Sequence, residues 1–503
     1  MKNKILLLVG ILTFGVMSCE LKEEPYGFYS DDNFYQTQED AESALLYLYN
    51  SFTFIEYTRA LNSIGDLPTE TTDLKPDEGQ DAQEMYDWRA AKIGTNLTLE
   101  NFFKYCYIAI NRANVLIEQV EAGDLGEEFK NKVIGEATVL KSWSYFHLVR
   151  VFGLVPVHEA SVRQLEDTGA PMAESLDVLY DMIITDLVKA EGMLEVNKSE
   201  ARVGRVDKVA AQSILAKIYL TIASSKENDV KLYRDMSKDV AAMYDSAAFW
   251  AGKVLYEQDD YYLDPDLTNV YDVNQPHGPE HIFILSHDRS GANEGNYSKT
   301  PLMFMPWVDG SPYYLKYEDG RLVYTTHGWE VYRVTHDFYA SFEADDQRGV
   351  DLIHDAVYDE NGDLVGSIAQ GSFTHPFSVK YQDPEFEGDR TSARPFLIRF
   401  ADIALTYAEA EGPTTEGYEW VNAVRQRAGL DPLESGLDEE AFRAAVLQER
   451  NWELCYEGQH LFDLRRTASV TSTVPQAAGL TEDEASFYPI PDREVRLNQE
   501  LSN

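Results

Sequence analysis

Residues 206–224, VDKVAAQSILAKIYLTIAS, carry two apolar stripes at helical spacing. Residues four apart form the first stripe, which consists of Val206, Ala210, Ile214, Ile218 and Ile222. The second stripe lies beside it and consists of Ala211, Leu215 and Tyr219. Apolar residues at steps of three and four share one face of a helix, so two such stripes predict a helix buried on more than one side. This stretch therefore predicts a helix packed inside a larger helical assembly.

The same periodicity recurs through most of the chain. Apolar residues at helical steps predict further helices over 39–57, 99–120, 133–152, 176–195, 396–411, 416–428 and 438–457. Long helices with short links favour antiparallel hairpins stacked on one another. The predicted fold class is therefore mainly α, a tetratricopeptide-like α-α superhelix, although no strict repeat consensus is visible.

The composition changes between residues 255 and 395, where Gly, Pro, Asp and Asn become frequent and apolar residues no longer recur at helical spacing. Asp319-Gly320 and Asn361-Gly362, each between apolar runs, predict two β-hairpins. This predicts a loop-rich insertion with small β-hairpins. The predicted parts are a signal peptide (1–18), a lipidated tether (19–38), a helical part (39–254), a ligand-binding insertion (255–395) and a second helical part (396–503).

The protein has 503 residues and is strongly acidic, with a formal net charge of −43 and a pI near 4.5. A chain this acidic repels phosphate backbones, so nucleic acid is excluded as a partner. It also repels anionic lipid surfaces, so membrane attachment requires an anchor that is not electrostatic. The acidic residues are spread along the chain, which is typical of a solvated surface.

The first eighteen residues predict a secretory signal: Lys2 and Lys4 precede a short apolar stretch that ends in a small residue before Cys19. The junction Val16-Met17-Ser18-Cys19 resembles the lipobox of bacterial lipoproteins. That resemblance implies that Cys19 is acylated and becomes the mature N-terminus, and several acyl chains anchor a protein firmly. The alternative is a plain signal peptide with a chance Cys. The acidic, Lys-bearing stretch after Cys19 resembles a signal for export to the outer face of the outer membrane, or is a solvated tether.

Residues 448–466, QERNWELCYEGQHLFDLRR, resemble the C-terminal signature of the SusD/RagB family, E-R-x-x-E-L-x-x-E-G-x-R-x-x-D-L-x-R. The matching residues are Glu449, Arg450, Glu453, Leu454, Glu457, Gly458, Asp463, Leu464 and Arg466. His460 stands where Arg is usual. Further blocks resemble the family in the right order, at 107–114, 135–156, 204–220, 342–348, 400–410, 425–429 and 489–498.

The resemblance spans nearly the whole chain and has consequences for fold and function. It implies an α-superhelical solenoid held on the outer surface of the outer membrane. It also implies capture of glycans or other oligomers, and a partner, a SusC-like TonB-dependent β-barrel transporter over which the binder sits as a lid.

Three acidic or histidine motifs resemble catalytic or metal-binding patterns. Glu449, Glu453 and Glu457 lie four apart on one helix face, but Arg450, Arg465 and Arg466 are interleaved, which favours salt bridges over acid–base chemistry. His277 and His281 match H-x-x-E-H, yet the Gly-Pro between them breaks the helix that a zinc site needs. Residues 359–370 begin like a calcium loop but lack its Gly and Glu. No catalytic residue, metal site or cofactor is predicted, although acidic loops such as 73–87 could hold Ca²⁺.

The remaining cysteines, Cys106 and Cys455, lie in helical patterns with apolar neighbours, and we expect buried thiols. A disulfide between them stays open at this point, since an oxidising compartment permits it.

Sugar recognition requires exposed aromatic faces with polar groups beside them. The segment 303–314, MFMPWVDGSPYY, places Trp307, Tyr313 and Tyr314 among Pro and Gly. Trp329 follows in a turn-rich span, and Trp88 lies in an acidic stretch after Asp73. These residues are the predicted ligand contacts. Three other tryptophans lie in helical stripes and are expected in the core, namely Trp143, Trp420 and Trp452.

The sequence thus predicts a lipid-anchored glycan-binding protein that is not an enzyme. The first alternative is the same architecture binding peptides, as the RagB branch suggests. The second is a surface glycoside hydrolase, which requires a pair of uncompensated carboxylates near exposed aromatics. A scaffold protein without a ligand is the third.

Overall fold

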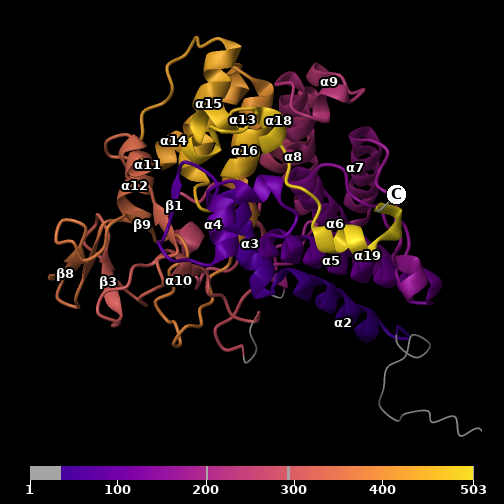
Figure 1. Ribbon diagram of the computed structural model, residues 1–503, viewed down its shortest axis with the longest axis horizontal. Helices are drawn as coiled ribbons and strands as arrows, with labels where there is room; N and C mark the ends of the chain where they lie inside the picture. The colour runs from indigo at the N-terminus through magenta and orange to yellow at the C-terminus, as the bar shows by residue number, and fades with distance from the viewer. Residues whose placement is uncertain (1–34, 200–201, 292–294, 502–503) are drawn as a thin grey trace, which may run out of the picture.

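The computed structural model describes residues 35–199, 202–291 and 295–501, so the predicted signal peptide and Cys19 lie outside the described residues (Figure 1). The N-terminal part is helical, with α2 (Gln38–Tyr49), α3 (Ile55–Gly65), α4 (Gln80–Tyr86), α5 (Leu97–Ala122), α6 (Glu127–Phe152), α7 (Leu176–Met193), α8 (Lys208–Glu227) and α9 (Val240–Glu257). No helix in the described ranges is long and apolar enough to cross a membrane.

Helices α5 to α9 pack as consecutive neighbours, each against the next. Polar side chains cap each of them except α6: the Asn96 side chain accepts a hydrogen bond from the Leu99 N–H at α5, and Asp207 accepts from Val209 and Ala210 at α8. The link between α5 and α6 is only four residues long, which forces the two helices to run antiparallel. The prediction of a mainly α fold made of stacked helical hairpins is confirmed.

Helix α8 lies inside this stack, as its two apolar stripes predicted. Every residue of both stripes is buried except Tyr219, which is half-buried. Helices α7, α9 and α13 contact it, so its apolar surface is covered from several sides. Burial of a Leu or Ile side chain contributes about 1.5–3 kcal/mol, so this helix is a large part of what holds the superhelix together.

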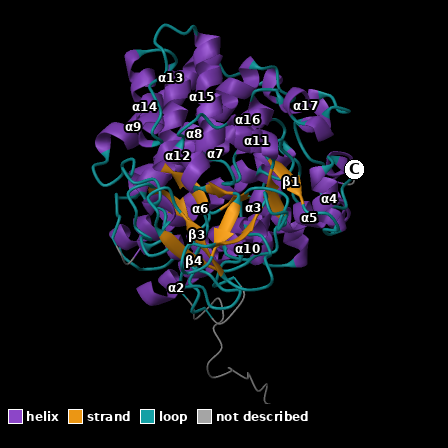
Figure 2. Ribbon diagram, turned by 90° about the vertical axis from the view of Figure 1, so that its left-hand side faces the viewer, coloured by secondary structure: helices purple, strands orange, loops and turns teal. Residues whose placement is uncertain are grey.

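The insertion contains β2 to β9, and the strands lie together below α13 to α15 in Figure 2. The largest sheet has the order β4-β3-β7-β8 and is formed by β3 (Tyr313–Lys316), β4 (Leu322–Thr325), β7 (Ala356–Tyr358) and β8 (Leu364–Ser367). Its hairpins β3–β4 and β7–β8 turn at Gly320 and Gly362, both at positive φ. Both predicted hairpins are therefore confirmed.

Two-stranded pairs tie distant parts of the chain together. They are β1 (Thr72–Leu74) with β5 (Tyr332–Val334), β2 (His281–Ile284) with β10 (Phe396–Arg399), and β6 (Ile353–His354) with β9 (Phe377–Ser378). The four-stranded sheet has a small core of its own, built around Met305, Tyr313, Leu315, Val357 and Phe377. The main core includes residues on both sides of 254 and 395, so those two domain boundaries stay predictions.

Short helices α10 (Thr300–Phe304), α11 (His336–Ser341) and α12 (Gln347–Asp351) complete the insertion. The C-terminal part contains α13 (Phe400–Glu411), α14 (Thr415–Arg427), α15 (Glu439–Glu453), α16 (His460–Arg466), α17 (Val470–Thr473), α18 (Glu482–Ala485) and α19 (Asp492–Leu497). In Figure 1 the four-stranded sheet lies at one end of the molecule, while α7 and the C-terminus lie at the other.

Three predicted helices have different bounds in the structure. The helix expected over 39–57 breaks after Tyr49, because Asn50 and Thr53 hydrogen-bond to each other in a turn that competes with the helix. The helix expected from 396 begins at Phe400, since the preceding four residues pair with β2. Helix α9 had not been predicted as a separate element.

The helix expected over 438–457 ends at Glu453, and the chain then turns through Gly458 at positive φ. Gly65 at the end of α3 explains this turn: a Cβ there would lie 2.2 Å from the carbonyl oxygen of Gly458. The signature loop and α3 therefore approach each other through bare backbone, which only glycine at these positions permits.

Candidate functional site

A groove of about 580 Å³ lies between α3, α4, the start of α5, α10 and β5; we call it the α3–β5 groove. Its lining comes from segments that are far apart in the sequence, namely Ile55, Glu56, Arg59, Ala60, Ser63, Glu78, Gly79, Asp81, Ala82, Leu97, Thr98, Asn101, Met303, Trp329, Val331 and Tyr332. A cavity of this size suits a small molecule or a few units of an oligomer.

Hydrogen bonds between these segments fix the shape of the groove. The Ser63 and Tyr332 hydroxyls lie 2.6 Å apart and join α3 to β5. The Asp81 carboxylate accepts a hydrogen bond of 2.9 Å from the N–H of Leu97, which ties α4 to the first turn of α5. The Trp329 N–H donates to the Leu302 carbonyl, and its own carbonyl accepts from Lys75 at 2.8 Å. The groove is therefore built on fixed elements.

The lining combines one aromatic platform with polar side chains. Trp329 is half-buried, while Glu56 and Arg59 are exposed and Asn101 is half-buried. Carboxylates and amides accept and donate the hydrogen bonds that hydroxyl groups make, and an indole covers an apolar ring face. The arrangement can hold a polar ligand that has a flat apolar face.

Trp307 is not among the lining residues of this groove. Its side chain is 54% exposed, and its ring packs edge-on against His327 with centroids 4.5 Å apart. A hydrogen bond from the Gly328 N–H to the Pro306 carbonyl places the residues that precede Trp329 and Trp307 side by side. The structure thus brings together two of the predicted contacts, Trp307 and Trp329.

Tyr314 lies apart from them on the four-stranded sheet. It is half-buried and packs against Tyr324 at 5.1 Å, which in turn packs against Phe386 at 5.4 Å. These three rings form an aromatic row on the sheet. Asp73 is engaged elsewhere: it accepts a hydrogen bond of 2.6 Å from Tyr86 and lies 3.3 Å from His375.

Two predicted contacts are buried, which corrects the expectation that they are exposed. Tyr313 is 2% exposed and packs in the core of the insertion, because strand alternation turns it inward while Tyr314 faces outward. Trp88 is also 2% exposed, donates its indole N–H to the Pro68 carbonyl at 3.0 Å and stacks on Tyr488. As packed, neither side chain is accessible to a ligand.

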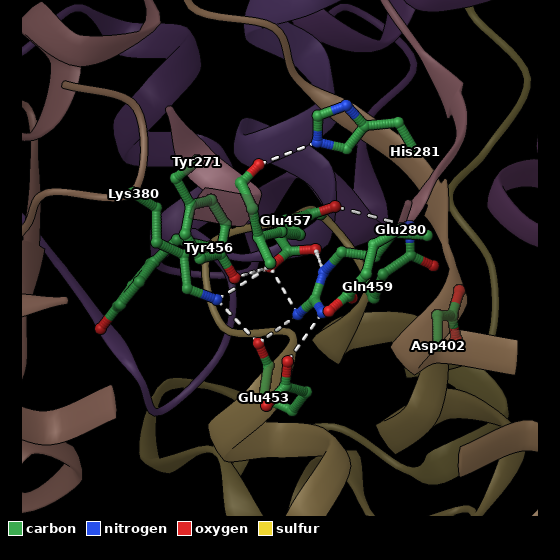
Figure 3. A network of polar contacts seen from close by, with 12 residues as sticks. Tyr271, Glu280, His281, Lys380, Asp402, Glu453, Tyr456, Glu457 and Gln459 are labelled. Carbon is green, nitrogen blue, oxygen red and sulfur yellow. Dashed lines mark hydrogen bonds and ion pairs between the residues drawn. The ribbon is translucent and has the colours of Figure 1, made fainter. Parts of the chain in front are cut away.

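The glutamates of the C-terminal signature are buried in a network of charges (Figure 3). Arg399 is the centre of this network: its guanidinium donates to Glu280, Glu453 and Glu457 at 2.7–3.0 Å, and to the Glu453 carbonyl. Lys380 donates to Glu457 at 2.8 Å. Burial alone raises the pKa of Glu453, but the surrounding arginines outweigh it and hold that pKa far below its usual range.

The glutamates do form salt bridges, but the predicted partners were wrong, because none of the three pairs with Arg450, Arg465 or Arg466. Glu449 pairs with Arg348 and Arg425, and Glu453 with Arg348, Arg399 and Arg427, all outside the signature. Among the interleaved arginines, Arg450 and Arg466 pair with Asp463. A carboxylate that is held ionised by several cations is a poor general acid, so this network stabilises the fold.

The structure also shows where the candidate metal ligands and the two cysteines lie. Within the described ranges no cluster of three or more His, Cys, Asp or Glu is placed to hold a metal ion. The H-x-x-E-H residues lie in a turn that enters β2, where the His281 ring bonds to the Val270 carbonyl. Cys106 and Cys455 are buried free thiols, as expected. The calcium expectation for residues 73–87 stays untested.

A second pocket, of about 640 Å³, lies on the other side of α5. Its lining is largely apolar and includes Phe103, Tyr107, Ile108 and Leu501, and none of the predicted ligand contacts is among its residues. The α3–β5 groove is the better candidate, because Trp329 lines it.

Sequence reasoning missed most of the groove. Arg59, Asp81 and Asn101 lie within helices whose apolar faces dominate the local pattern. No short-range signal marks them, since they meet only after four separate segments have packed together.

This fold defines a helical solenoid with an inserted, loop-rich part that contains most of the strands. Comparison with known proteins identifies it further. The profile of the SusD family matches residues 354–503, and a profile described as starch-binding, associating with the outer membrane, matches residues 34–220. The chain belongs to the SusD/RagB family.

Individual relatives agree along the whole chain. SusD-like protein P38 of Formosa agariphila is 25% identical, over 99% of this chain and 98% of that protein. A solved SusD homologue from Bacteroides thetaiotaomicron has a TM-score of 0.76 at 22% identity, over 93% of this chain and 97% of the other. Surface glycan-binding protein A from the same species, solved with laminarihexaose, has a TM-score of 0.73 at 18% identity, over 92% and 98% of the two chains.

Proposed function

We propose that this protein binds an oligosaccharide in the α3–β5 groove, on the outer surface of the cell, and delivers it to a SusC-like TonB-dependent transporter. The observation that carries this proposal is the lining of the groove, which combines Trp329 with hydroxyl-binding side chains. The exposed Trp307 lies close by in the fold, since its neighbour Pro306 accepts a hydrogen bond from Gly328, the residue before Trp329. Sugars present apolar C–H faces and polar rims, and this lining offers a surface for each.

The charges of the groove favour a neutral or cationic glycan. Glu56, Glu78 and Asp81 line it together with a single cationic residue, Arg59, and the whole chain carries a large negative charge. An anionic polysaccharide would be repelled by this field.

Family membership supports a binding role over a catalytic one. A relative of the same fold was solved with laminarihexaose and is named a surface glycan-binding protein. The signature glutamates are neutralised by buried arginines, which leaves a glycoside hydrolase without its pair of free carboxylates there. Peptide capture by the same groove is the second candidate, because its carboxylates would also bind basic side chains.

Isothermal titration of soluble residues 20–503 against neutral, cationic and anionic oligosaccharides tests the proposal. We expect saturable binding to a neutral class without cleavage products, and about a tenfold weaker affinity in Trp329→Ala, since an aromatic contact contributes about 1.4 kcal/mol. The matched control is Phe249→Ala, an exposed aromatic on α9, which should leave the affinity unchanged. Cleavage products would support a hydrolase, and binding only to peptides would support the second candidate.

The anchor is tested separately. Cys19→Ser should shift the protein from the outer-membrane fraction to a soluble fraction, because an acyl anchor requires the thiol. Retention of the variant in the membrane would refute lipidation at Cys19. Co-purification of the wild-type protein with a TonB-dependent transporter tests the partner.

A further inference from the structure

Two buried arginines, Arg150 on α6 and Arg465 on α16, form no ion pair with any carboxylate in the described part of the chain. Their side chains are only 6% and 5% exposed. Burial lowers the pKa of each guanidinium to about 10, so both stay charged at neutral pH. A buried charge without a counter-charge costs several kcal/mol, which makes two such charges side by side an anomaly that requires an explanation.

The hydrogen-bond donors of these arginines are also incompletely used. Nε and Nη2 of Arg150 are enclosed and have no acceptor among the described residues, and neither has Nη2 of Arg465. Arg465 donates only to carbonyls, to Ala485 at 2.9 Å and to Arg150 at 3.3 Å. The rings of Phe146 and Phe462 lie 4.3 and 4.0 Å from the Arg150 guanidinium carbon, which stabilises its faces but leaves the N–H groups at its edges unpaired.

The nearest carboxylates that act on Arg150 are already neutralised. Asp463 pairs with Arg450 and Arg466, both at 2.9 Å. Asp402 pairs with Arg450 at 3.0 Å and with Lys217. The Tyr180 and Tyr233 hydroxyls near Arg150 bond to each other. The described residues therefore supply no anion for the two guanidiniums.

A cavity of about 20 Å³ lies where these groups meet. Arg150, Arg465 and Arg466 line it together with Ser225 and Ser486. A space of this size holds one water-sized particle and is too small for sulfate, phosphate or a sugar. The Ser486 hydroxyl already donates to the Glu482 carbonyl, so the donors left for an anion are the free N–H groups of Arg150 and Arg465.

We propose that this cavity binds a single halide-sized monovalent anion, such as chloride, as the internal counterion of Arg150 and Arg465. A water molecule would accept one or two of the free N–H groups but would not offset the charge. The anion would lie between α6, α8 and α16, and so would link the N-terminal helices to the C-terminal part. The site is distinct from the α3–β5 groove and has no element of that groove in its lining.

The direct test is a crystal of residues 20–503 grown or soaked in bromide, with data collected at the bromine absorption edge. We expect an anomalous peak within about 3.5 Å of guanidinium nitrogens of both arginines. A cavity that holds only water, without an anomalous peak, would overturn the proposal. This test uses the wild-type protein, so it does not depend on whether a variant folds.

Thermal unfolding gives an independent test in solution. At constant ionic strength, replacing gluconate by chloride should raise Tm by on the order of 1–2 °C once chloride exceeds its dissociation constant about tenfold. Arg150→Met, which removes one charge and keeps similar bulk, should abolish that rise. The control Arg89→Met removes an exposed arginine and should keep it. An equal Tm of the wild-type protein in both salts would contradict the proposal.

Discussion

Arg399 should be the most sensitive residue of the buried network. Its five N–H donors are all used, in bonds of 2.7–3.0 Å to three carboxylates and one carbonyl. Arg399 ends β10, and its partners come from two other parts of the chain: Glu280 precedes β2, and Glu453 and Glu457 belong to the C-terminal signature. Arg399 therefore joins the insertion to the C-terminal helices.

Arg399→Met should lower the free energy of unfolding by about 3–5 kcal/mol, the range for removing one partner of a buried ion pair. The side chain of Met has similar bulk, so the loss comes from the hydrogen bonds and the positive charge that the three carboxylates lose. Glu453 retains Arg427 at 2.5 Å and Glu457 retains Lys380, which keeps the effect within this range. Urea unfolding followed by far-UV circular dichroism measures the loss.

Arg89→Met serves as the control, because Arg89 pairs with Asp87 at the surface and its loss should cost less than about 0.5 kcal/mol. Arg399→Lys retains the charge but not the planar guanidinium, so its loss of unfolding free energy should lie between those of the other two variants. If Arg399→Met were as stable as Arg89→Met, the reasoning that this network holds the two parts together would be refuted.

Three further predictions concern titration and reactivity. Burial raises the pKa of Asp66 to about 7, so between about pH 4 and 7 the folded state holds a proton that the unfolded state has lost. The free energy of unfolding should therefore fall as pH rises through this window. Asp66→Asn should remove this pH dependence, measured as the difference between the urea midpoints at pH 5 and pH 8. Burial alone lowers the pKa of His460, but the Glu70 carboxylate at 2.7 Å outweighs burial and raises that pKa. The stability that this ion pair contributes is complete below about pH 6.5 and is lost as pH rises through the raised pKa. His460→Arg should retain that stability at pH 9 in the same urea assay. Burial raises the pKa of Cys106 and Cys455, so neither thiol should react with Ellman's reagent until urea unfolds the protein, and fast labelling of the native state would contradict their burial.

Most of the helical scaffold was accessible to sequence reasoning, because its signal is local. The two stripes of residues 206–224 predicted α8 and its burial on several sides. The errors occurred where tertiary contacts override local preference. Residues 396–399 pair with β2 although they continue the apolar pattern of α13, and the helix ending at Glu453 yields to the close contact of Gly458 with Gly65.

The candidate site was accessible only in part. Aromatic residues among Pro and Gly identified Trp307 and Trp329, which lie together. The same reasoning selected Tyr313 and Trp88, which are both buried. For Tyr313, composition does not show whether a strand residue faces inward or outward. For Trp88, an acidic loop has the same composition whether its tryptophan is exposed or packs on the core. The register of β3 in the sheet turns Tyr313 inward, and stacking on Tyr488 buries Trp88.

The sequence by itself determined the fold class, the family signature, the hairpin turns and the need for salt bridges around the signature glutamates. Each of these follows from residues within about twenty positions of one another. Only the tertiary structure decided which arginines neutralise Glu453, where the α3–β5 groove lies, and that Arg150 and Arg465 meet without a counter-charge. These depend on side chains that are 26 to 315 residues apart in the sequence, and their distances are fixed by the packing of the whole core and by no local pattern.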